Sequence, residues 1–418
     1  MAQLSDDCFA FGGDLLSMSA ALELLGAKVA PVAEPETVPL KAALGRILAA
    51  PLVAPRDVPP HDNSAVDGYA VYFDDLVPGQ PTRLALAGRA AAGHPLAGDA
   101  RRGEAVRIFT GAPMPAGPDT VLMQEDCREV DGSVEIPPGI KRGANRRRAG
   151  EDVKAGATVL RRGQRLRAQE IGLAASLGRT TLEVYRPLRV AIFSTGDEVR
   201  DPGGELAPGA IYDANRYVLQ ALLQGLGAAV TDLGILPDER ARIAGALAEA
   251  ARGHDLILTS GGMSTGEEDH VKAAVEAQGR LHFWRLAIKP GRPVAMGQVG
   301  RVPFMGLPGN PVAVMVTFLI LTRPLLLRLS GAEPAPPRRF RVAAGFDYKK
   351  RSNRCEYVRA RLERGEDGGW VARKFPRDGA GILTSMVESD GLAEIGEGIA
   401  RIEPGMNIDF IPFSEVLE

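Results

Sequence analysis

The feature that most constrains the fold of this 418-residue chain is a regular alternation of strand-like and helix-like segments between residues 188 and 330. Short apolar runs with the length and composition of buried strands are followed by stretches with apolar residues at helical spacing. Such strands pair in parallel, and the intervening helices cover both faces of the sheet. We therefore predict a doubly wound, mostly parallel α/β domain. The expected strands are Val190–Ser194, Val230–Leu236, Leu256–Leu258 and His282–Ile288, and the expected helices include Asn215–Gln224 and Asp238–Ala251.

Much of the expected chemistry of this domain lies in one stretch, Asp255–His270. A strand is followed by Ser260–Gly262, where paired glycines let the backbone turn sharply and approach a ligand. The hydroxyl of Ser264 comes next, and Asp269 is placed to cap the following helix. Glycines, hydroxyls and carboxylates together predict a site for a phosphate and its divalent metal. An ordinary strand-to-helix turn with a solvated acidic cap is the alternative that the residues leave open.

Further carboxylates follow the other predicted strands. Asp197 and Glu198 come after the first strand, and Asp238 comes after the second. In open α/β sheets, ligands bind beyond the carboxyl ends of the strands, and those ends meet at one edge. We therefore expect these carboxylates to converge with the Ser260–Gly262 turn and with Asp269 on a single rim.

Two later loops are expected to complete this rim. Residues 289–293 place the cations of Lys289 and Arg292 on a backbone stiffened by proline, which suits the binding of an oxyanion. Residues 306–311 end another strand, and Asn310 is placed to cap the apolar helix that follows, with Pro311 in its first turn. The free N–H groups at this helix start could receive a phosphate.

Outside the α/β domain, the sequence no longer shows a regular alternation of strand-like and helix-like segments. Helices are expected at Ala20–Lys28, with Ser19 as N-cap, and at Leu40–Ala49. Elsewhere short strand-like runs are separated by Gly and Pro, which is typical of β-modules. The runs are Arg83–Ala87, Ala105–Phe109, Val121–Met123 and Ser133–Ile136, and later Phe340–Ala343, Tyr357–Leu362, Trp370–Ala372 and Ile408–Pro412. These patterns predict a small β-module inserted after the N-terminal helices, then the α/β domain, and then a separate C-terminal β-barrel or sandwich. In the barrel, Arg354, Arg359 and Ser385 are the polar candidates for reaching the central rim.

A proline-stiffened loop holds two more acids, Asp62 and Asp67. Two carboxylates this close could hold a metal or a polar substrate. An Asx turn at a domain hinge explains the same spacing, and both interpretations stay open at this stage.

Composition narrows the class of protein. The formal charge of −2 provides no global basic field, so we expect no nucleic-acid partner and no binding to an anionic membrane. The three cysteines are far apart in the sequence and form neither a zinc motif nor a disulfide framework, which fits a reducing compartment. The longest apolar run, Val312–Leu321, ends at Arg323-Pro324 and is too short to span a bilayer. A cytoplasmic protein is predicted.

A set of short motifs then points to a known family. In chain order they are PHDNSAVDGYAV, IFTGAP, RRRAGEDV, FSTGDE, IYDANR, SGGMSTGEEDH, LAIKPGRP and GLPGNP. The combination resembles the molybdopterin molybdenumtransferases, the molybdate-insertion enzymes of molybdenum cofactor biosynthesis, and is similar also to the E domain of gephyrin. The resemblance implies four parts: an elongated N-terminal domain (1–55 and 150–187), an inserted β-rich domain (56–149), an α/β domain (188–330) like that of molybdopterin adenylyltransferases, and a C-terminal β-barrel (331–418). It also implies a homodimer with a composite active site.

The resemblance also implies a reaction. Adenylated molybdopterin and molybdate would be the substrates, and molybdenum cofactor and AMP the products, with Mg²⁺ as the cofactor. The dithiolene sulfurs of the pterin would become the ligands of molybdenum, so that no cysteine cluster is needed. The molybdopterin adenylyltransferase and recipient apoenzymes are candidate partners.

Site residues follow from the resemblance position by position. The implied catalytic residues are Asp67, Glu198, Asp238, Asp269 and Lys289, with Asp238 and Asp269 as metal ligands. The implied substrate-binding residues are Thr110, Asp152, Ser260, Gly261, Gly262, Ser264, Arg285, Arg292, Pro308, Gly309, Asn310, Arg359 and Ser385. The chain departs from the family at Trp284-Arg285, where members often have Trp-Lys. Charge is kept there, but a planar guanidinium replaces a point charge.

Two other functions remain as alternatives. A molybdopterin adenylyltransferase would need only the α/β domain, and the flanking domains and the DNSAVDGYA loop argue against it. A non-catalytic molybdopterin-binding scaffold would have no need of Asp67, Asp238, Asp269 and Lys289, all of which are present.

Overall fold

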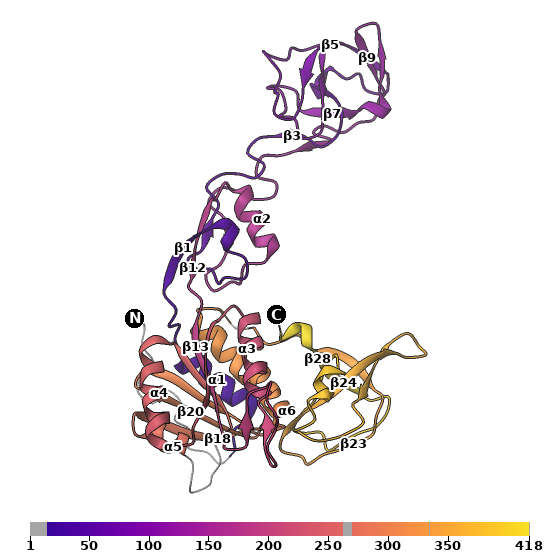
Figure 1. The fold of residues 1–418 in the computed structure, drawn as a ribbon. Coiled ribbons are helices and arrows are strands. Elements are labelled where there is room, and N and C mark those ends of the chain that lie inside the picture. Colours follow the sequence, from indigo (N-terminus) through magenta and orange to yellow (C-terminus); the bar gives the residue numbers. More distant parts are fainter. Residues whose placement is uncertain (1–14, 262–269, 334, 418) are drawn as a thin grey trace. The chain divides into compact units, whose positions relative to one another are not determined.

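The computed structural model describes residues 15–261, 270–333 and 335–417. The chain divides into two compact units, which are described separately (Figure 1). Unit 1 comprises the residues up to Ala49, Arg162–Arg167 and the residues from Leu182 onward, and unit 2 comprises Ala50–Arg161 and Ala168–Thr181.

A six-stranded sheet with the order β16-β13-β17-β21-β20-β18 forms the centre of unit 1. Neighbouring strands from β16 to β21 are parallel, whereas β20 is antiparallel to both β21 and β18. One strand therefore runs against the other five, and the prediction of a mostly parallel sheet is confirmed. The strands are β13 (Arg189–Thr195), β16 (Ala229–Leu236), β17 (Leu256–Ser260), β18 (Gly279–Arg285), β20 (Pro293–Val299) and β21 (Val302–Leu307).

Helices cover both faces of this sheet, as expected for a doubly wound fold (Figure 1). Because side chains alternate along a strand, Val190 and Ile192 of β13 pack with α3, whereas Ala191 and Phe193 pack with α4 and α5. All four side chains are almost fully buried. The helices are α3 (Asn215–Gly225), α4 (Arg240–Gly253) and α5 (His270–Glu276), and the short strands β14 (Val199–Arg200) and β15 (Ile211–Tyr212) pair beside them.

The helix that follows β21 is longer than the sequence suggested. It continues through Arg323-Pro324 as α6 (Pro311–Thr317), a π-helical turn (Phe318–Thr322) and α7 (Arg323–Leu329). Proline lacks the N–H that continues an α-helical ladder, and the wider turn directly before it lets the helix go on. The 19 residues are long and apolar enough to cross a membrane by length and composition, but 78% of the most apolar window is buried inside the protein. Here it forms the core between sheet and barrel.

The C-terminal part of unit 1 is a closed barrel. Its strands are β22 (Phe340–Ala344), β24 (Cys355–Arg364), β25 (Trp370–Lys374), β26 (Gly391–Ile395) and β28 (Asn407–Pro412). Strand β24 pairs with both β25 and β26, which closes the five strands into a ring and confirms the predicted barrel. The sequence analysis did not anticipate β26. Shorter elements are β23 (Tyr348–Lys349), β27 (Arg401–Ile402) and α8 (Thr384–Val387).

A two-residue strand connects sheet and barrel. Strand β19 (Ile288–Lys289) follows β18 in the chain, yet it pairs in parallel with β24 of the barrel. The register places Lys289 beside Glu356. The expected single strand His282–Ile288 is therefore wrong, because the chain leaves the sheet at Arg285 and joins the barrel at Ile288.

The N-terminal segment of unit 1 differs from two expectations. Helix α1 (Met18–Lys28) is capped by Ser17, whose Oγ accepts a hydrogen bond from the N–H of Ala20, and not by Ser19. The helix expected at Leu40–Ala49 is wrong, because only a 3₁₀ turn forms, over Leu40–Ala42. Beyond it, Leu48 and Ala49 donate their N–H groups to Gln164 and Glu183, so distant chain segments take the bonds that a helix would use. Strands β1 (Pro35–Pro39) and β12 (Thr181–Tyr185) pair nearby.

Unit 2 contains a six-stranded β-sheet with the order β7-β4-β6-β5-β9-β8. Four of these strands match the predicted short β-runs closely. The strands are β4 (Gly68–Val71), β5 (Thr82–Ala90), β6 (Glu104–Ile108), β7 (Thr120–Met123), β8 (Arg128–Val130) and β9 (Ser133–Ile136). The remaining elements of the unit are β2 (Leu52–Val53), β3 (Asn63–Ser64), β10 (Arg146–Arg147), β11 (Thr158–Leu160) and α2 (Ala168–Ser176).

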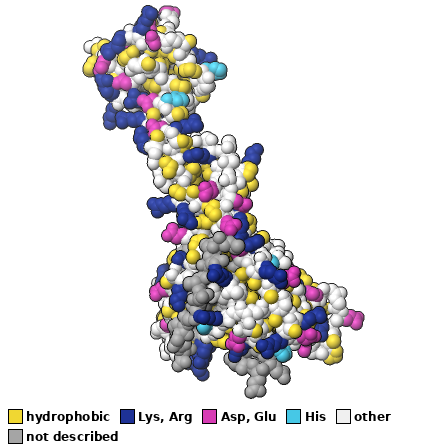
Figure 2. Space-filling model, turned by 90° about the vertical axis from the view of Figure 1, so that its left-hand side faces the viewer, with side chains coloured by type: hydrophobic (Ala, Val, Ile, Leu, Met, Phe, Trp, Pro, Cys, Tyr) yellow, Lys and Arg dark blue, Asp and Glu magenta, His cyan; other side chains and the backbone are white. Residues whose placement is uncertain are grey.

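Over both units, dark-blue Lys and Arg side chains are interspersed with magenta Asp and Glu side chains on the face shown in Figure 2. This distribution matches the small net charge. An anion site in this protein must therefore be built by local side chains.

Candidate functional site

The carboxyl ends of β13 and β17 open into a pocket of about 310 Å³, which we call the rim pocket. Several residues predicted from separate motifs line it together: Glu198, Asp238, Ser260, Gly261 and Gly309. The parallel strands bring these motifs to one edge of the sheet, as the sequence analysis expected. Gly262, Ser264 and Asp269 lie outside the described residues.

Glycines create the space in this pocket. A Cβ on Gly196 would lie 2.6 Å from Oε2 of Glu198, and the residue has a φ of +133°. Gly261 also has a positive φ, of +82°. Both conformations are costly for other residues. Gly261, the described glycine of the predicted turn after β17, has the positive φ that a sharp turn requires, and the glycine after β13 makes room for a carboxylate.

Asn215 joins the two loops of the rim pocket. Its Nδ2 donates to Oγ of Ser260 at 2.8 Å and to the carbonyl of Gly309 at 2.7 Å. Its own Oδ1 is buried without a hydrogen-bond partner among the described residues. The sequence analysis quoted the IYDANR motif but gave Asn215 no role. A polar residue at the first position of a helix beyond a strand end was the signal that could have found it.

The start of α3 is anchored by a buried ion network. Arg216 is 4% exposed and pairs with Asp213, Asp232 and Asp201. Burial alone would lower the pKa of Arg216, but hydrogen bonds from it to Asp232 and Asp213 raise this pKa above its usual value. The guanidinium therefore stays charged and fixes the loop that carries Asn215.

Unpaired hydroxyls mark the same edge of the sheet. The side-chain oxygens of Ser194, Thr195 and Thr259 are buried and have no hydrogen-bond partner among the described residues. Buried polar groups normally have partners, so these three and Asn215 identify the rim as a place built for a polar ligand. Among the described residues, those of the rim included, no three His, Cys, Asp or Glu side chains are grouped to hold a metal ion.

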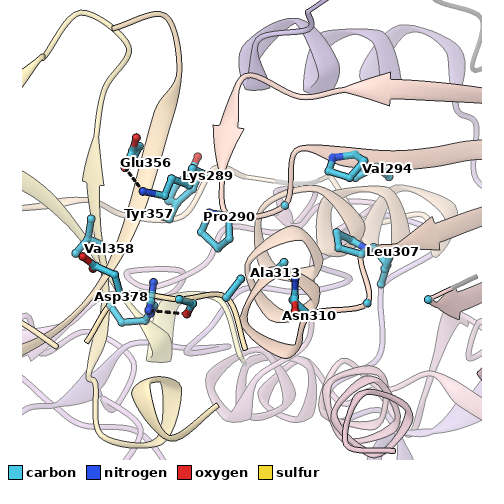
Figure 3. Close-up of a pocket in the computed structure, with 18 of the residues that line it drawn as sticks. Lys289, Pro290, Val294, Leu307, Asn310, Ala313, Glu356, Tyr357, Val358 and Asp378 are labelled. Atoms are coloured by element: carbon cyan, nitrogen blue, oxygen red, sulfur yellow. Dashed lines mark hydrogen bonds and ion pairs between the residues drawn. The ribbon is translucent and has the colours of Figure 1, made fainter. Parts of the chain in front are cut away.

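A second pocket, of about 580 Å³, lies between the α/β sheet and the barrel, and we call it the barrel pocket. In Figure 3, Asn310, Ala313 and Leu307 line one side, and Glu356, Tyr357 and Val358 of β24 line the other. It shares Glu198, Gly261 and Gly309 with the rim pocket, so the two pockets adjoin. Pro308 also lines it.

Two cations face this second pocket. Lys289 is half exposed, whereas Arg359 is only 8% exposed. Arg359 donates to Oγ of the buried Ser385 at 3.0 Å and to the carbonyl of Gly379 at 3.1 Å. No hydrogen bond or ion pair joins it to a carboxylate among the described residues. Burial lowers its pKa, and this outweighs the opposite effect of the Asp378 charge. A buried guanidinium held only by neutral groups is suited to an oxyanion ligand.

Other predicted residues lie away from these pockets. Arg285 and Arg292 line neither of the two pockets, although both flank the loop that carries Lys289. Conversely, the sequence analysis assigned no role to Tyr348 and Glu356, which line the barrel pocket beside Lys289. Their partners come from other segments of the chain, so no local motif marks them.

In unit 2, Asp67 and Thr110 are brought together. A single oxygen of Asp67, Oδ1, accepts the N–H of Thr110 at 2.8 Å and its hydroxyl at 2.7 Å. The hydrogen bond from the Thr110 backbone, followed by that from its side chain, lowers the pKa of Asp67. Asp67 is thus held as a carboxylate, and none of the described residues donates a hydrogen bond to its second oxygen. Asp152 lies in the same unit and is exposed.

Comparisons with known proteins decide the family. Three models match in chain order: the MoeA N-terminal region (domain I and II) over residues 16–178, a probable molybdopterin binding domain over 191–328, and the MoeA C-terminal region (domain IV) over 341–413. A molybdopterin molybdenumtransferase of Haemophilus influenzae is 39% identical over 90% of this chain and 94% of its own length. This chain belongs to the molybdopterin molybdenumtransferase family.

Other members support the assignment. Molybdopterin molybdenumtransferase 2 of Mycobacterium tuberculosis is 36% identical over 90% of this chain and 94% of its own length. The crystal structure of the molybdopterin biosynthesis MoeA protein of Pyrococcus horikoshii OT3 covers 96% of this chain and all of its own, with a TM-score of 0.82 and 29% identity. The resemblance seen in the motifs is confirmed, and with it the expectation of a transferase of molybdenum cofactor biosynthesis.

Proposed function

We propose that this molybdopterin molybdenumtransferase inserts molybdate into adenylated molybdopterin and releases AMP in a Mg²⁺-dependent reaction. The observation that carries the proposal is the buried guanidinium of Arg359, which is held by Ser385 and Gly379 and opens to the barrel pocket. Lys289 lines the same pocket. A small dianion fits between two such cations better than an uncharged group does.

The adjoining rim pocket suits the organic substrate. It combines the carboxylates of Glu198 and Asp238 with glycine turns and the unpaired Oδ1 of Asn215. We propose that adenylated molybdopterin extends along the rim pocket, so that its dithiolene reaches the barrel pocket. The two pockets share Gly261 and Gly309, which supports one continuous substrate path.

The residues also suit the expected metal. Mg²⁺ prefers carboxylate oxygens, and Asp238 at the rim supplies one of the two ligands that we propose, with Asp269 as the other. When bound, Mg²⁺ would balance the charge of the pyrophosphate that links AMP to molybdopterin. Glu198 and Asp238 would position this group so that the oxygen of a water molecule bonds to one phosphorus as the phosphoanhydride bond breaks, which yields AMP and the terminal phosphate of molybdopterin.

The proposal includes a cytoplasmic homodimer in which the active site is composite, with Asp67, Thr110 and Asp152 contributed to a site completed by a second subunit. The motifs that carry the family resemblance support it. Mixing an Asp67→Ala variant with an Asp238→Ala variant tests it, because only a composite site would regain activity in mixed dimers. Mixed variants that stay inactive although they form dimers would exclude the composite site.

The decisive experiment measures AMP release from adenylated molybdopterin in a single turnover, with Mg²⁺, in the presence and absence of molybdate. We expect release that depends on molybdate and produces a cofactor able to activate an apoenzyme. Consumption of ATP to adenylate molybdopterin would instead identify an adenylyltransferase. Binding of adenylated molybdopterin with no AMP release would indicate a scaffold.

A further inference from the structure

The carboxylate of Glu356 is buried at the centre of a charged cluster in the barrel pocket, and it is only 1% exposed. It accepts hydrogen bonds from the hydroxyl of Tyr348 at 2.6 Å and from Nε of Arg354 at 2.8 Å. Nη2 of Arg354 lies 2.7 Å from the same carboxylate. A buried charge is tolerated when it is paired and hydrogen-bonded, and Arg354 meets this need. Glu356 therefore does not require Lys289 for its own neutralisation.

Lys289 is held loosely in the same cluster. Its Nζ lies 3.4 Å from Oε2 of Glu356 and 3.4 Å from the hydroxyl of Tyr348, both longer than a usual charged hydrogen bond. The ammonium also lies 5.9 Å from the centre of the Tyr348 ring. Figure 3 shows Lys289 and Glu356 side by side at the wall of the pocket. These contacts orient the ammonium and leave its N–H groups available to a ligand.

The backbone fixes this arrangement. Strand β19 pairs with β24, and the register sets Lys289 directly beside Glu356. The N–H of Cys355 donates to the carbonyl of Ala287 at 2.7 Å, which ties the two segments at the adjoining position. Lys289 therefore has a defined starting position, although its side chain is half exposed.

We infer that Glu356 and Tyr348 are a positioning pair for the anion site: they hold the Lys289 ammonium ready, and the incoming oxyanion draws it away from Glu356. This inference rests on the proposed function, because it takes molybdate as the oxyanion. Glu356 keeps its bonds to Tyr348 and Arg354 when Lys289 turns. The carboxylate competes with the oxyanion for Lys289, so it limits the affinity for molybdate and eases departure of the anion.

The two members of the pair have opposite expected effects. Glu356→Gln keeps the size and an acceptor for Tyr348, but it removes the competing charge. We expect the Kd for molybdate to fall by roughly three- to tenfold, the order for removal of one like charge in a partly solvated site. Tyr348→Phe removes one contact of Lys289 and one partner of Glu356, so Lys289 is drawn closer to the carboxylate and the Kd is expected to rise.

A double variant tests whether Glu356 acts through Lys289. Lys289→Ala should weaken molybdate binding, and Glu356→Gln should bring little improvement in that background. The matched control is Glu363→Gln, which removes a carboxylate from the same strand at a half-exposed position that does not line the pocket. Binding is measured on the full chain by calorimetric titration of molybdate, with the unfolding midpoint of each variant and the KM for molybdate in AMP release.

The outcomes separate the two proposals. Tighter binding in Glu356→Gln that disappears in the Lys289→Ala background supports the positioning pair. An undiminished gain in that background, a Glu356→Gln variant that behaves like the Glu363→Gln control, or weaker binding with a lowered unfolding midpoint would each overturn it while leaving the proposed function intact. A wild-type protein that binds no molybdate would overturn the proposed function, and this inference with it.

Discussion

Thr110 donates both its N–H and its hydroxyl to one oxygen of Asp67, at 2.8 and 2.7 Å. The acceptor and the donors come from different strand ends of unit 2, since Asp67 precedes β4 and Thr110 follows β6. They hold the carboxylate in one orientation and favour its charged form. Both residues belong to motifs that carry the family resemblance, so their bond joins two parts of the proposed site.

This bond predicts separate effects of charge and position. Asp67→Asn retains an acceptor for Thr110, so the protein should fold normally, but the charge is lost and AMP release should fall by roughly a hundredfold or more. Unfolding curves and single-turnover rates test this. A variant with the activity of the wild type would exclude Asp67 from the reaction.

The pH dependence follows from the same contacts. The hydrogen bonds lower the pKa of Asp67, so its charged form persists as the pH falls through the range where a free carboxylate would protonate. Removing the hydroxyl by Thr110→Ala should move this pKa upward. Titration of the Asp67 carboxyl by NMR in both proteins is the measurement. An unchanged pKa would show that the backbone N–H alone sets it.

The contact between Arg359 and Ser385 leads to a prediction for the affinity of the proposed oxyanion site. Arg359→Met keeps much of the apolar stem and removes the buried charge, so we expect molybdate affinity to fall by roughly a hundredfold. Ser385→Ala removes only the hydroxyl that accepts from Nε, and a loss of about tenfold is expected. Calorimetric titration with molybdate tests both. Equal losses in the two variants would mean that Ser385 is a direct ligand.

The backbone conformation of Gly196 leads to a prediction for the stability and activity of a variant at the rim pocket. In Gly196→Ala the new Cβ would meet the carboxylate of Glu198, and φ would stay at +133°, so we expect a loss of about 1–3 kcal/mol in stability and reduced AMP release. Gly204 is the matched control, because no atom lies within 4 Å of a Cβ built there. Similar behaviour of Gly196→Ala and Gly204→Ala would contradict the prediction.

Asp255 predicts the acid stability of unit 1. Burial would raise its pKa, but hydrogen bonds from Arg186 and Arg189 outweigh burial and lower the pKa to about 2. With an unfolded value of 3.8, its contribution is fully present above about pH 4 and is lost as the pH falls towards 2. Asp255→Asn should cost about 1–2 kcal/mol at neutral pH and less at pH 2. Denaturant unfolding at several pH values tests this.

Periodic patterns predicted β13, β16 and β17 well, because apolar residues that are close together in the sequence mark each of these strands. The helix starting at Asn215 and the strand Ser133–Ile136 were placed within a residue or at their observed bounds. The helix predicted over residues 40–49 was wrong because contacts with distant segments outweigh the local pattern. Their apolar spacing fits a helix, but Leu48 and Ala49 bond to segments more than a hundred residues away.

The candidate site residues divide in the same way, into those marked by a local motif and those that depend on distant partners. Glu198, Asp238 and Gly309 were found because each stands in a motif at the end of a strand. Asn215 and Glu356 were missed because their importance depends on partners that only the fold supplies. Asn215 bonds to Gly309, and Glu356 faces Lys289 across a two-residue strand. The residues next to Asn215 and Glu356 in the sequence do not indicate which distant residues these two contact.

The pairing of β19 with β24 ties the barrel to the chain segment that carries Lys289. An α/β domain cut free of its barrel would keep the sheet, the glycine turns and Asn310, yet it would lose the strand that holds Lys289 in place. Under the proposed function, the cation that would bind the oxyanion is thus held in place by a strand of the barrel. For the same reason, a rotation of the barrel relative to the sheet would move Lys289 relative to Asn310. We expect such a movement to change the affinity of the barrel pocket for its anion.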